Sequence, residues 1–150
     1  MSLTRINGKY VTFPIGCPQE AVDWEDFIIT KNPDGSRTAM TLSRFPRCSI
    51  VRQVVQTVDK EFRPIDGFAR LYSDGEFLGS IARYVRDGRL ISTVFPADGG
   101  PEDCMETDFD QSREVLGYHP TSVEGWKFQR MDLNVKGPQN ISLFTTSLTW

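Results

Sequence analysis

Apolar and polar residues alternate most clearly between Asp66 and Phe95. Two Asp-Gly pairs, Asp74-Gly75 and Asp87-Gly88, divide this segment into three runs. Asp-Gly between alternating runs is the strongest short-range signal for a β-hairpin. The segment therefore predicts a three-stranded antiparallel meander with strands over 66–73, 76–86 and 89–95.

Similar signals extend the pattern on both sides. Asn32-Pro33-Asp34-Gly35 has strong turn chemistry and predicts a hairpin between strands over 23–30 and 36–45. Segment 49–59 fits both a helix and a strand, but its four valines and its threonine favour a strand. Further strands are expected over 104–111 and 141–150, and one short helix over 122–131.

Neither face of the expected strand 76–86 is purely polar. One face carries Phe77, Gly79, Ile81, Arg83 and Val85, and the other carries Leu78, Ser80, Ala82, Tyr84 and Arg86. Mixed faces are typical of a sheet that curves around a core or a cavity. Gly79 suits a bend or a bulge. A two-residue turn at 74–75 predicts that Arg70 pairs with Gly79, and Arg83 with Asp66.

Composition supports the same fold class. The 150 residues match one ordinary domain, so we expect a single domain over 1–150. Val, Ile and Thr number 32, against 14 for Ala and Leu, which favours strands over a helical bundle. We predict an all-β fold: one strongly curved antiparallel sheet, a half-barrel or open barrel, with one short helix.

Charge and motif content exclude several classes of protein. The net charge of −3 and the absence of any Lys/Arg run longer than two argue against nucleic-acid binding. The longest apolar stretches have four or five residues, too few for a membrane span. Three cysteines without CxxC spacing, and no apolar signal segment at the start, favour a reducing cytoplasmic location.

Metal and cofactor motifs are also missing. His119 is the only histidine, which excludes multi-histidine metal sites. The acidic block from Asp98 to Asp110 does not match the spacing of a calcium loop, because Asp103 stands where the glycine is needed. The chain has neither a phosphate-binding glycine loop nor a GxGxxG motif. We expect no metal and no cofactor.

Five residues are candidates for a functional site. His119 is the natural general acid or base if the protein is an enzyme. Arg70, in a predicted strand, could hold a carboxylate or a phosphate. Tyr72, Tyr84 and Trp126 could line an apolar ligand pocket. Each also has an ordinary structural alternative: a loop histidine, a solvated arginine, or core aromatics.

The meander over 56–95, with its FRPIDGFARL and DGEFLGS segments, resembles the curved sheets of uncharacterised bacterial half-barrel proteins of the LolA-like fold. A lipocalin-like barrel is a similar alternative. The resemblance implies long strands joined by short polar turns, with a concave side that accepts an acyl chain or another apolar ligand. It covers about a quarter of the chain and includes no catalytic motif.

Three functional hypotheses follow. The first is a binding protein that holds a small apolar or aromatic ligand, neutral or anionic, in the concave face of the sheet through Arg70, Tyr72, Tyr84 and Trp126. The second is a cofactor-independent isomerase or lyase that uses His119 as general acid or base. The third is an interaction module that forms a homodimer through the segment from Ile141 to Trp150.

Overall fold

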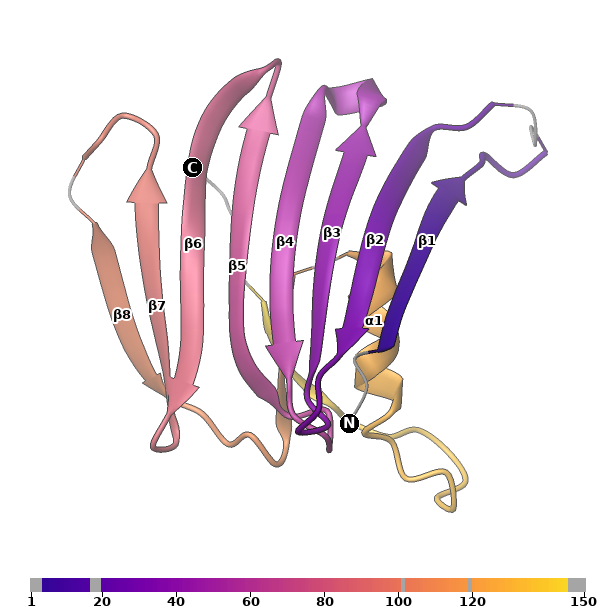
Figure 1. Cartoon of the computed structure of the whole chain (residues 1–150), viewed down its shortest axis with the longest axis vertical. Coiled ribbons are helices and arrows are strands. Elements are labelled where there is room, and N and C mark those ends of the chain that lie inside the picture. The colour runs from indigo at the N-terminus through magenta and orange to yellow at the C-terminus, as the bar shows by residue number, and fades with distance from the viewer. Residues whose placement is uncertain (1–3, 17–19, 101, 119, 146–150) are drawn as a thin grey trace.

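Strands account for most of this protein. The structure is a computed structural model that describes residues 4–16, 20–100, 102–118 and 120–145. Eight strands form one antiparallel sheet (Figure 1): β1 (Thr4–Thr12), β2 (Asp23–Lys31), β3 (Arg37–Phe45), β4 (Ile50–Val58), β5 (Pro64–Ser73), β6 (Glu76–Arg86), β7 (Arg89–Pro96) and β8 (Asp103–Asp108). The all-β prediction is confirmed as far as a mostly-β fold with one large antiparallel sheet and a short helix.

The sheet is a simple meander in which each strand pairs with the next one along the chain. Short connections join neighbouring strands, apart from a longer one between β1 and β2 and a 3₁₀ turn over Pro46–Cys48. β1 and β8 are its two edges, and the sheet is neither closed nor strongly curled. The half-barrel or open barrel is therefore not confirmed.

The hairpin turns adopt the geometry that their sequences predict. Asp74 and Gly75 have φ angles of 52° and 85°, and Asp87 and Gly88 have 52° and 73°. Positive φ at both central residues defines the type I′ turn, whose twist matches that of the flanking strands. The expected strands over 66–73, 76–86 and 89–95 thus correspond to β5, β6 and β7.

A β-bulge makes the predicted register wrong by one residue. Between β5 and β6, Leu71 pairs with Gly79 and Tyr72 with Phe77, which leaves Leu78 as the extra residue. Arg70 consequently pairs with Ser80 instead of Gly79, and Asp66 pairs with Tyr84 instead of Arg83. Gly79 has φ 148°, so the expectation of a bend or bulge there is correct. Phe77 stays paired with Tyr72, with 5.5 Å between the ring centroids, but the bulge places it on the opposite face from Ile81 and Arg83, with which it was expected to share a face.

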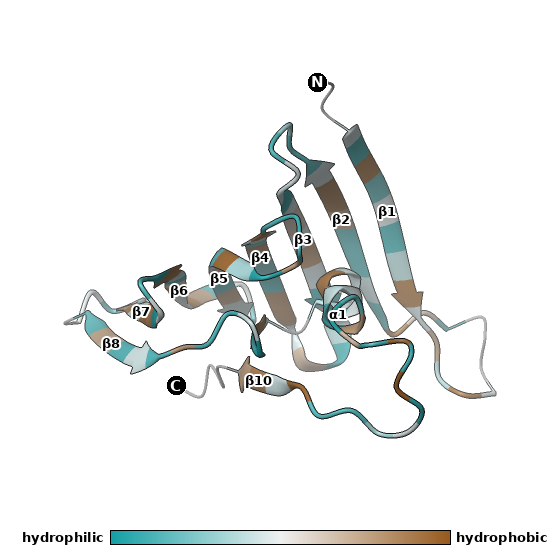
Figure 2. Ribbon diagram, turned by 90° about the horizontal axis from the view of Figure 1, so that it is seen from below, coloured by the Kyte–Doolittle hydropathy of each residue, from teal (hydrophilic) through white to brown (hydrophobic). Residues whose placement is uncertain are grey.

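The segment after β8 folds back over one face of the sheet (Figure 2). It contains β9 (Glu114–Gly117), the helix α1 (Thr121–Phe128) and β10 (Ser142–Thr145), which pairs in parallel with β9. The predicted helix over 122–131 corresponds to α1. β10 lies in the segment expected to join two protomers, but its described pairing is within the chain. Residues 146–150 fall outside the described part.

The core lies between this segment and the sheet. Val54, Ala69, Ile81 and Leu90 project from the sheet, and Phe109, Leu116 and Tyr118 pack on them. We call this side of the sheet the covered face. The other side carries Ile28, Met40, Val55, Phe68 and Ala82, and we call it the open face.

Three sequence expectations need correction. β1 and β9 were not expected from the sequence, because β1 contains glycine, lysine and asparagine among its apolar residues and β9 has only four residues. The strand expected over 104–111 is shorter, since β8 covers only Asp103–Asp108; most of its residues are exposed, and Met105 retains 51% of its accessible surface. No helix in the described part is long and apolar enough to cross a membrane.

Candidate functional site

The described part has hollows on both faces of the sheet that are large enough to hold a small molecule. One, of about 390 Å³, lies on the open face between β2 and β5. The other, of about 370 Å³, lies on the covered face between α1 and the β1–β2 edge, and we call it the edge pocket. Both volumes fall in the range of ligand pockets, roughly 300–1,000 Å³.

The edge pocket has walls from two layers of the fold. Its lining residues come from β1, β2 and β3, from the β4–β5 turn, and from α1 with the residue that follows it. They are Thr4, Ile6, Ile29, Lys31, Arg37, Phe62, Trp126 and Gln129. Apolar and aromatic side chains form most of the wall. The polar groups are one hydroxyl, one amide and two cations, the usual composition of a small-molecule site.

Phe62 reaches the pocket because the β4–β5 turn holds it in an unusual backbone conformation. Its φ is +62°, in the left-handed region that costs a non-glycine residue about 1–2 kcal/mol. Such a conformation persists only where the surrounding structure determines it, and residues of this kind cluster at functional sites. The contacts around the turn supply that constraint.

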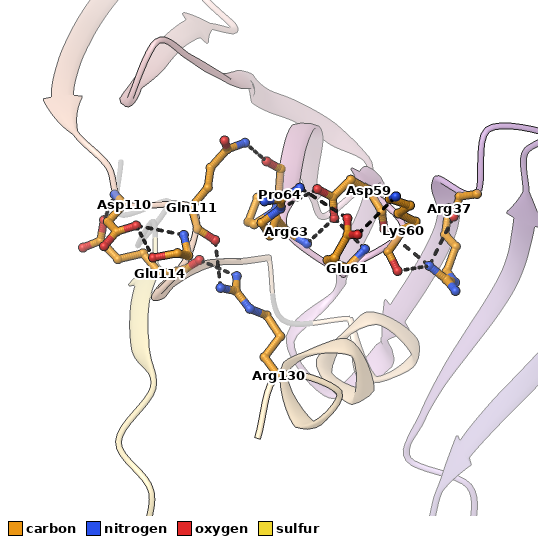
Figure 3. A network of polar contacts seen from close by, with 12 residues as sticks. Arg37, Asp59, Lys60, Glu61, Arg63, Pro64, Asp110, Gln111, Glu114 and Arg130 are labelled. Atoms are coloured by element: carbon orange, nitrogen blue, oxygen red, sulfur yellow. Dashed lines mark hydrogen bonds and ion pairs between the residues drawn. The ribbon is translucent and has the colours of Figure 1, made fainter. Parts of the chain in front are cut away.

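Asp59 and Arg63 close the turn (Figure 3). One carboxylate oxygen of Asp59 accepts the backbone N–H groups of Glu61 at 2.9 Å and Arg63 at 2.8 Å, and the other accepts Nε of Arg63 at 2.6 Å. Burial raises the pKa of Asp59, but these hydrogen bonds and the positive charge of Arg63 together bring it below the usual 3.8. Asp59 is therefore ionised at neutral pH and keeps Phe62 in place.

Arg37 connects the turn to the pocket. Its Nη1 donates to the backbone carbonyls of Asp59 at 3.3 Å and Lys60 at 3.2 Å (Figure 3). Its guanidinium carbon lies 4.1 Å from the centroid of the Phe62 ring, within the range of a cation–π contact. These contacts hold a positive charge against the aromatic wall of the pocket.

The pocket has an unbalanced positive charge. Lys31 and Arg37 line it, whereas Asp and Glu are absent from the lining residues. Within the described ranges, neither cation forms an ion pair with a carboxylate. A ligand with a negative group would supply the missing partner.

The structure does not bring the predicted site residues together. Arg70, Tyr72 and Tyr84 lie on the open face, on β5 and β6. Trp126 lies on α1 and lines the edge pocket behind the other face. His119 lies outside the described residues, so its catalytic role stays a prediction. The structure therefore divides the expected ligand site into two regions.

Sequence reasoning missed Phe62, Lys31 and Arg37 as pocket residues. The signal for Phe62 is weak: it follows Asp59-Lys60-Glu61, a polar turn between two strands. Its position beside Trp126 depends on contacts between segments more than 60 residues apart. Local patterns contain no information about such a contact.

The other buried polar and charged side chains do not form a ligand site, and some of them line a third, smaller hollow. It measures about 70 Å³ and is lined in part by Glu25, Ser43 and Arg52, which makes it too small for a ligand of the expected size. Arg83 and Tyr118 are buried in the core instead, with the guanidinium carbon 5.5 Å from the ring centroid. Burial lowers the pKa of Arg83 and raises that of the Tyr118 hydroxyl. Both groups have structural positions away from the hollows.

No group of three or more His, Cys, Asp or Glu side chains in the described part is arranged to hold a metal ion.

Comparisons with known protein families, with curated proteins and with solved structures gave no match.

Proposed function

We propose that this protein binds a small apolar or aromatic molecule that carries a negative charge, and that the edge pocket is the binding site. The observation that carries the proposal is the combination of aromatic and aliphatic walls with two cations that lack carboxylate partners there. The proposal retains the expected ligand class and Trp126. It moves the site from the sheet face of Arg70, Tyr72 and Tyr84 to the edge beside α1.

The roles of the residues follow from their chemistry. Trp126 and Phe62 offer flat surfaces for an aromatic or aliphatic body, which gains affinity by leaving water. Arg37 is already held by backbone carbonyls, so little conformational entropy is lost when it pairs with an anion. Lys31 is an exposed lining residue that adds a second positive charge to the pocket.

Binding of 2-naphthoate and of the neutral 2-naphthamide tests the charge preference. The two probes share the same ring system and differ in charge. We expect 2-naphthoate to bind more tightly in calorimetry and to change the tryptophan fluorescence. Lys31→Met should weaken 2-naphthoate binding about fivefold, as expected for an ion pair of about 1 kcal/mol, and leave 2-naphthamide unchanged. Trp126→Leu should weaken both.

Lys136→Met is the matched control, because it removes the same charge from an exposed side chain that does not line the pocket. Binding by this variant should equal that of the unmodified protein. The proposal is wrong if neither probe binds at millimolar concentration. It is also wrong if Lys31→Met and Trp126→Leu both leave binding unchanged.

A further inference from the structure

The open face carries a continuous apolar row that runs across five strands. Ile28 pairs with Met40, Met40 with Val55, Val55 with Phe68, and Phe68 with Ala82. Met40, near the middle of this row, retains 53% of its accessible surface. The described segment after β8 packs on the opposite face (Figure 2), so none of its elements covers this row.

The size of this face matches a protein interface better than a small ligand. The six strands β2 to β7, about 4.8 Å apart and about 30 Å long, give a face of roughly 800–900 Å². A standard protein–protein interface buries about 800 Å² on each partner. The 390 Å³ hollow occupies only the part between β2 and β5.

Two opposite charges flank the apolar row symmetrically. On β5, Asp66 lies two residues before Phe68 and Arg70 two residues after it, so the three side chains share the open face. Asp66 and Arg70 are exposed, and neither forms an ion pair within the described ranges. Arg70 lies with its guanidinium carbon 5.3 Å from the Phe68 ring centroid.

This arrangement is complementary to itself. A two-fold axis along the apolar row, at right angles to the strands, places Phe68 over Phe68 of a second copy. The same rotation places Asp66 over Arg70 of the second copy and Arg70 over its Asp66, which forms two opposite-charge pairs. An interface with a two-fold axis requires this kind of self-complementary patch.

The edge strands limit the contact to the middle of the sheet. The same rotation brings Arg5 near Lys9 of the second copy on β1, and Glu102 near Glu106 at β8, which are pairs of like charge. Stacked sheets twist relative to each other, so their corners diverge. Strands β2 to β7 therefore form the contact, and the charged edges remain in water.

We infer that two copies of this chain dimerise face to face through the open face, with Met40 and Phe68 near the centre and two Asp66–Arg70 pairs between the copies. This surface is distinct from the 141–150 segment that the sequence indicated. It is independent of the edge pocket, which lies on the opposite face. The expected product is a two-sheet sandwich with α1 on each outer side.

Sedimentation equilibrium of the full chain tests the apolar contact. We expect the mass of two chains at submillimolar concentration. Met40→Glu should raise the dimer dissociation constant about tenfold or more, because it places a charge at the interface centre. Met105→Glu, at an equally exposed position on the covered face of β8, is the matched control and should leave the dissociation constant unchanged.

Charge reversal tests the symmetry. Asp66→Arg and Arg70→Asp each create two like-charge contacts between the copies. Each variant alone should therefore have a dimer dissociation constant at least about tenfold higher than the unmodified protein. Mixing the two variants should restore a dimer that contains one copy of each, because all facing charges are then opposite. The double variant should also dimerise by itself. Both positions are exposed, and circular dichroism verifies that each variant folds.

The inference is overturned if the unmodified protein is monomeric up to submillimolar concentration. A monomer whose open face binds an apolar dye would overturn it equally. It is also overturned if Met40→Glu and Met105→Glu behave alike, or if the mixture of Asp66→Arg and Arg70→Asp remains monomeric. A dimer lost only on deletion of residues 141–150 would place the interface elsewhere. Failure of the edge pocket to bind 2-naphthoate would not bear on the dimer, because the two sites lie on opposite faces of the sheet.

Discussion

Glu25 and Ser122 lie 97 residues apart in the sequence, yet the Glu25 carboxylate accepts the backbone N–H of Ser122 at 2.9 Å. Its other oxygen accepts the N–H of Thr121 at 3.0 Å and the hydroxyl of Ser43 at 3.0 Å. Pro120 precedes α1 and gives no side-chain cap. A side chain of the sheet therefore caps the helix, which fixes α1 and hence Trp126 on the covered face.

Glu25→Gln should lower the free energy of unfolding by about 1–3 kcal/mol, measured by urea denaturation. Glu25 retains only 5% of its accessible surface. The amide of glutamine has one acceptor oxygen, whereas both carboxylate oxygens of Glu25 accept hydrogen bonds. Glu76→Gln, at an exposed position beside the 74–75 turn, should change stability by less than about 0.5 kcal/mol. Equal effects of the two substitutions would show that the cap contributes nothing.

Asp59→Asn should change how stability depends on pH. The folded-state pKa of Asp59 is below 3.8, the value of the unfolded chain, so the ionised form is favoured by folding. The stabilisation from ionised Asp59 is fully present at about one pH unit above 3.8. It is lost as the pH falls through the folded-state pKa. The stability difference between the unmodified protein and Asp59→Asn should therefore be largest at neutral pH and shrink in acid.

Denaturation curves between neutral pH and about pH 2 measure this effect. Asp103→Asn, an exposed carboxylate on β8, is the control for loss of charge alone. A difference that stays constant, or grows, as the pH falls would contradict the role of ionised Asp59. Because Asp59 holds the turn that carries Phe62, the same variant should also weaken 2-naphthoate binding in the edge pocket.

Gly67→Ala should destabilise the protein by about 1–3 kcal/mol. A methyl group at Gly67 would overlap the phenol ring of Tyr118, which is 96% buried, as its 4% exposure shows. Neither the ring nor the β5 backbone can move easily in this part of the core. Thermal or urea denaturation measures the loss, and a stability equal to that of the unmodified protein would show that Tyr118 packs differently.

Gly125→Ala should have the opposite sign. Gly125 lies inside α1, and a methyl group there would meet no atom within 4 Å other than its chain neighbours and the backbone of the helix itself. Alanine has a higher helix propensity than glycine by about 0.8–1.0 kcal/mol at an exposed helical position. We expect a gain of about 0.5–1 kcal/mol in the free energy of unfolding. Loss of stability would indicate that the exposed side of α1 contacts another part of the chain.

Much of the sheet could be predicted from the sequence because hairpin signals are local. Asp-Gly pairs at 74–75 and 87–88 require positive φ, and the alternation beside them defines which residues form strands. The four valines of 49–59 correctly favoured a strand, which is β4. Register was less predictable, because the bulge at Leu78 adds one residue and shifts every later pair between β5 and β6.

The candidate sites were far less predictable. Arg70 and Tyr84 were proposed as ligand-binding residues, but alternation alone does not reveal which face the rest of the chain covers. That choice depends on Phe109, Leu116 and Tyr118, which follow β8 in the chain and pack on the side chains of the sheet through long-range contacts. Phe62 and Trp126 meet at the edge pocket for the same reason.

By itself, the sequence determined the fold class, the strands from β2 to β7 and the turns between them, since neighbouring residues specify these features through backbone sterics and side-chain alternation. The tertiary structure decided the rest: the Leu78 bulge, the covered face, and the separation of Trp126 from Arg70. These depend on which distant apolar surfaces exclude water together, and the hydrophobic effect has no preferred direction along the chain.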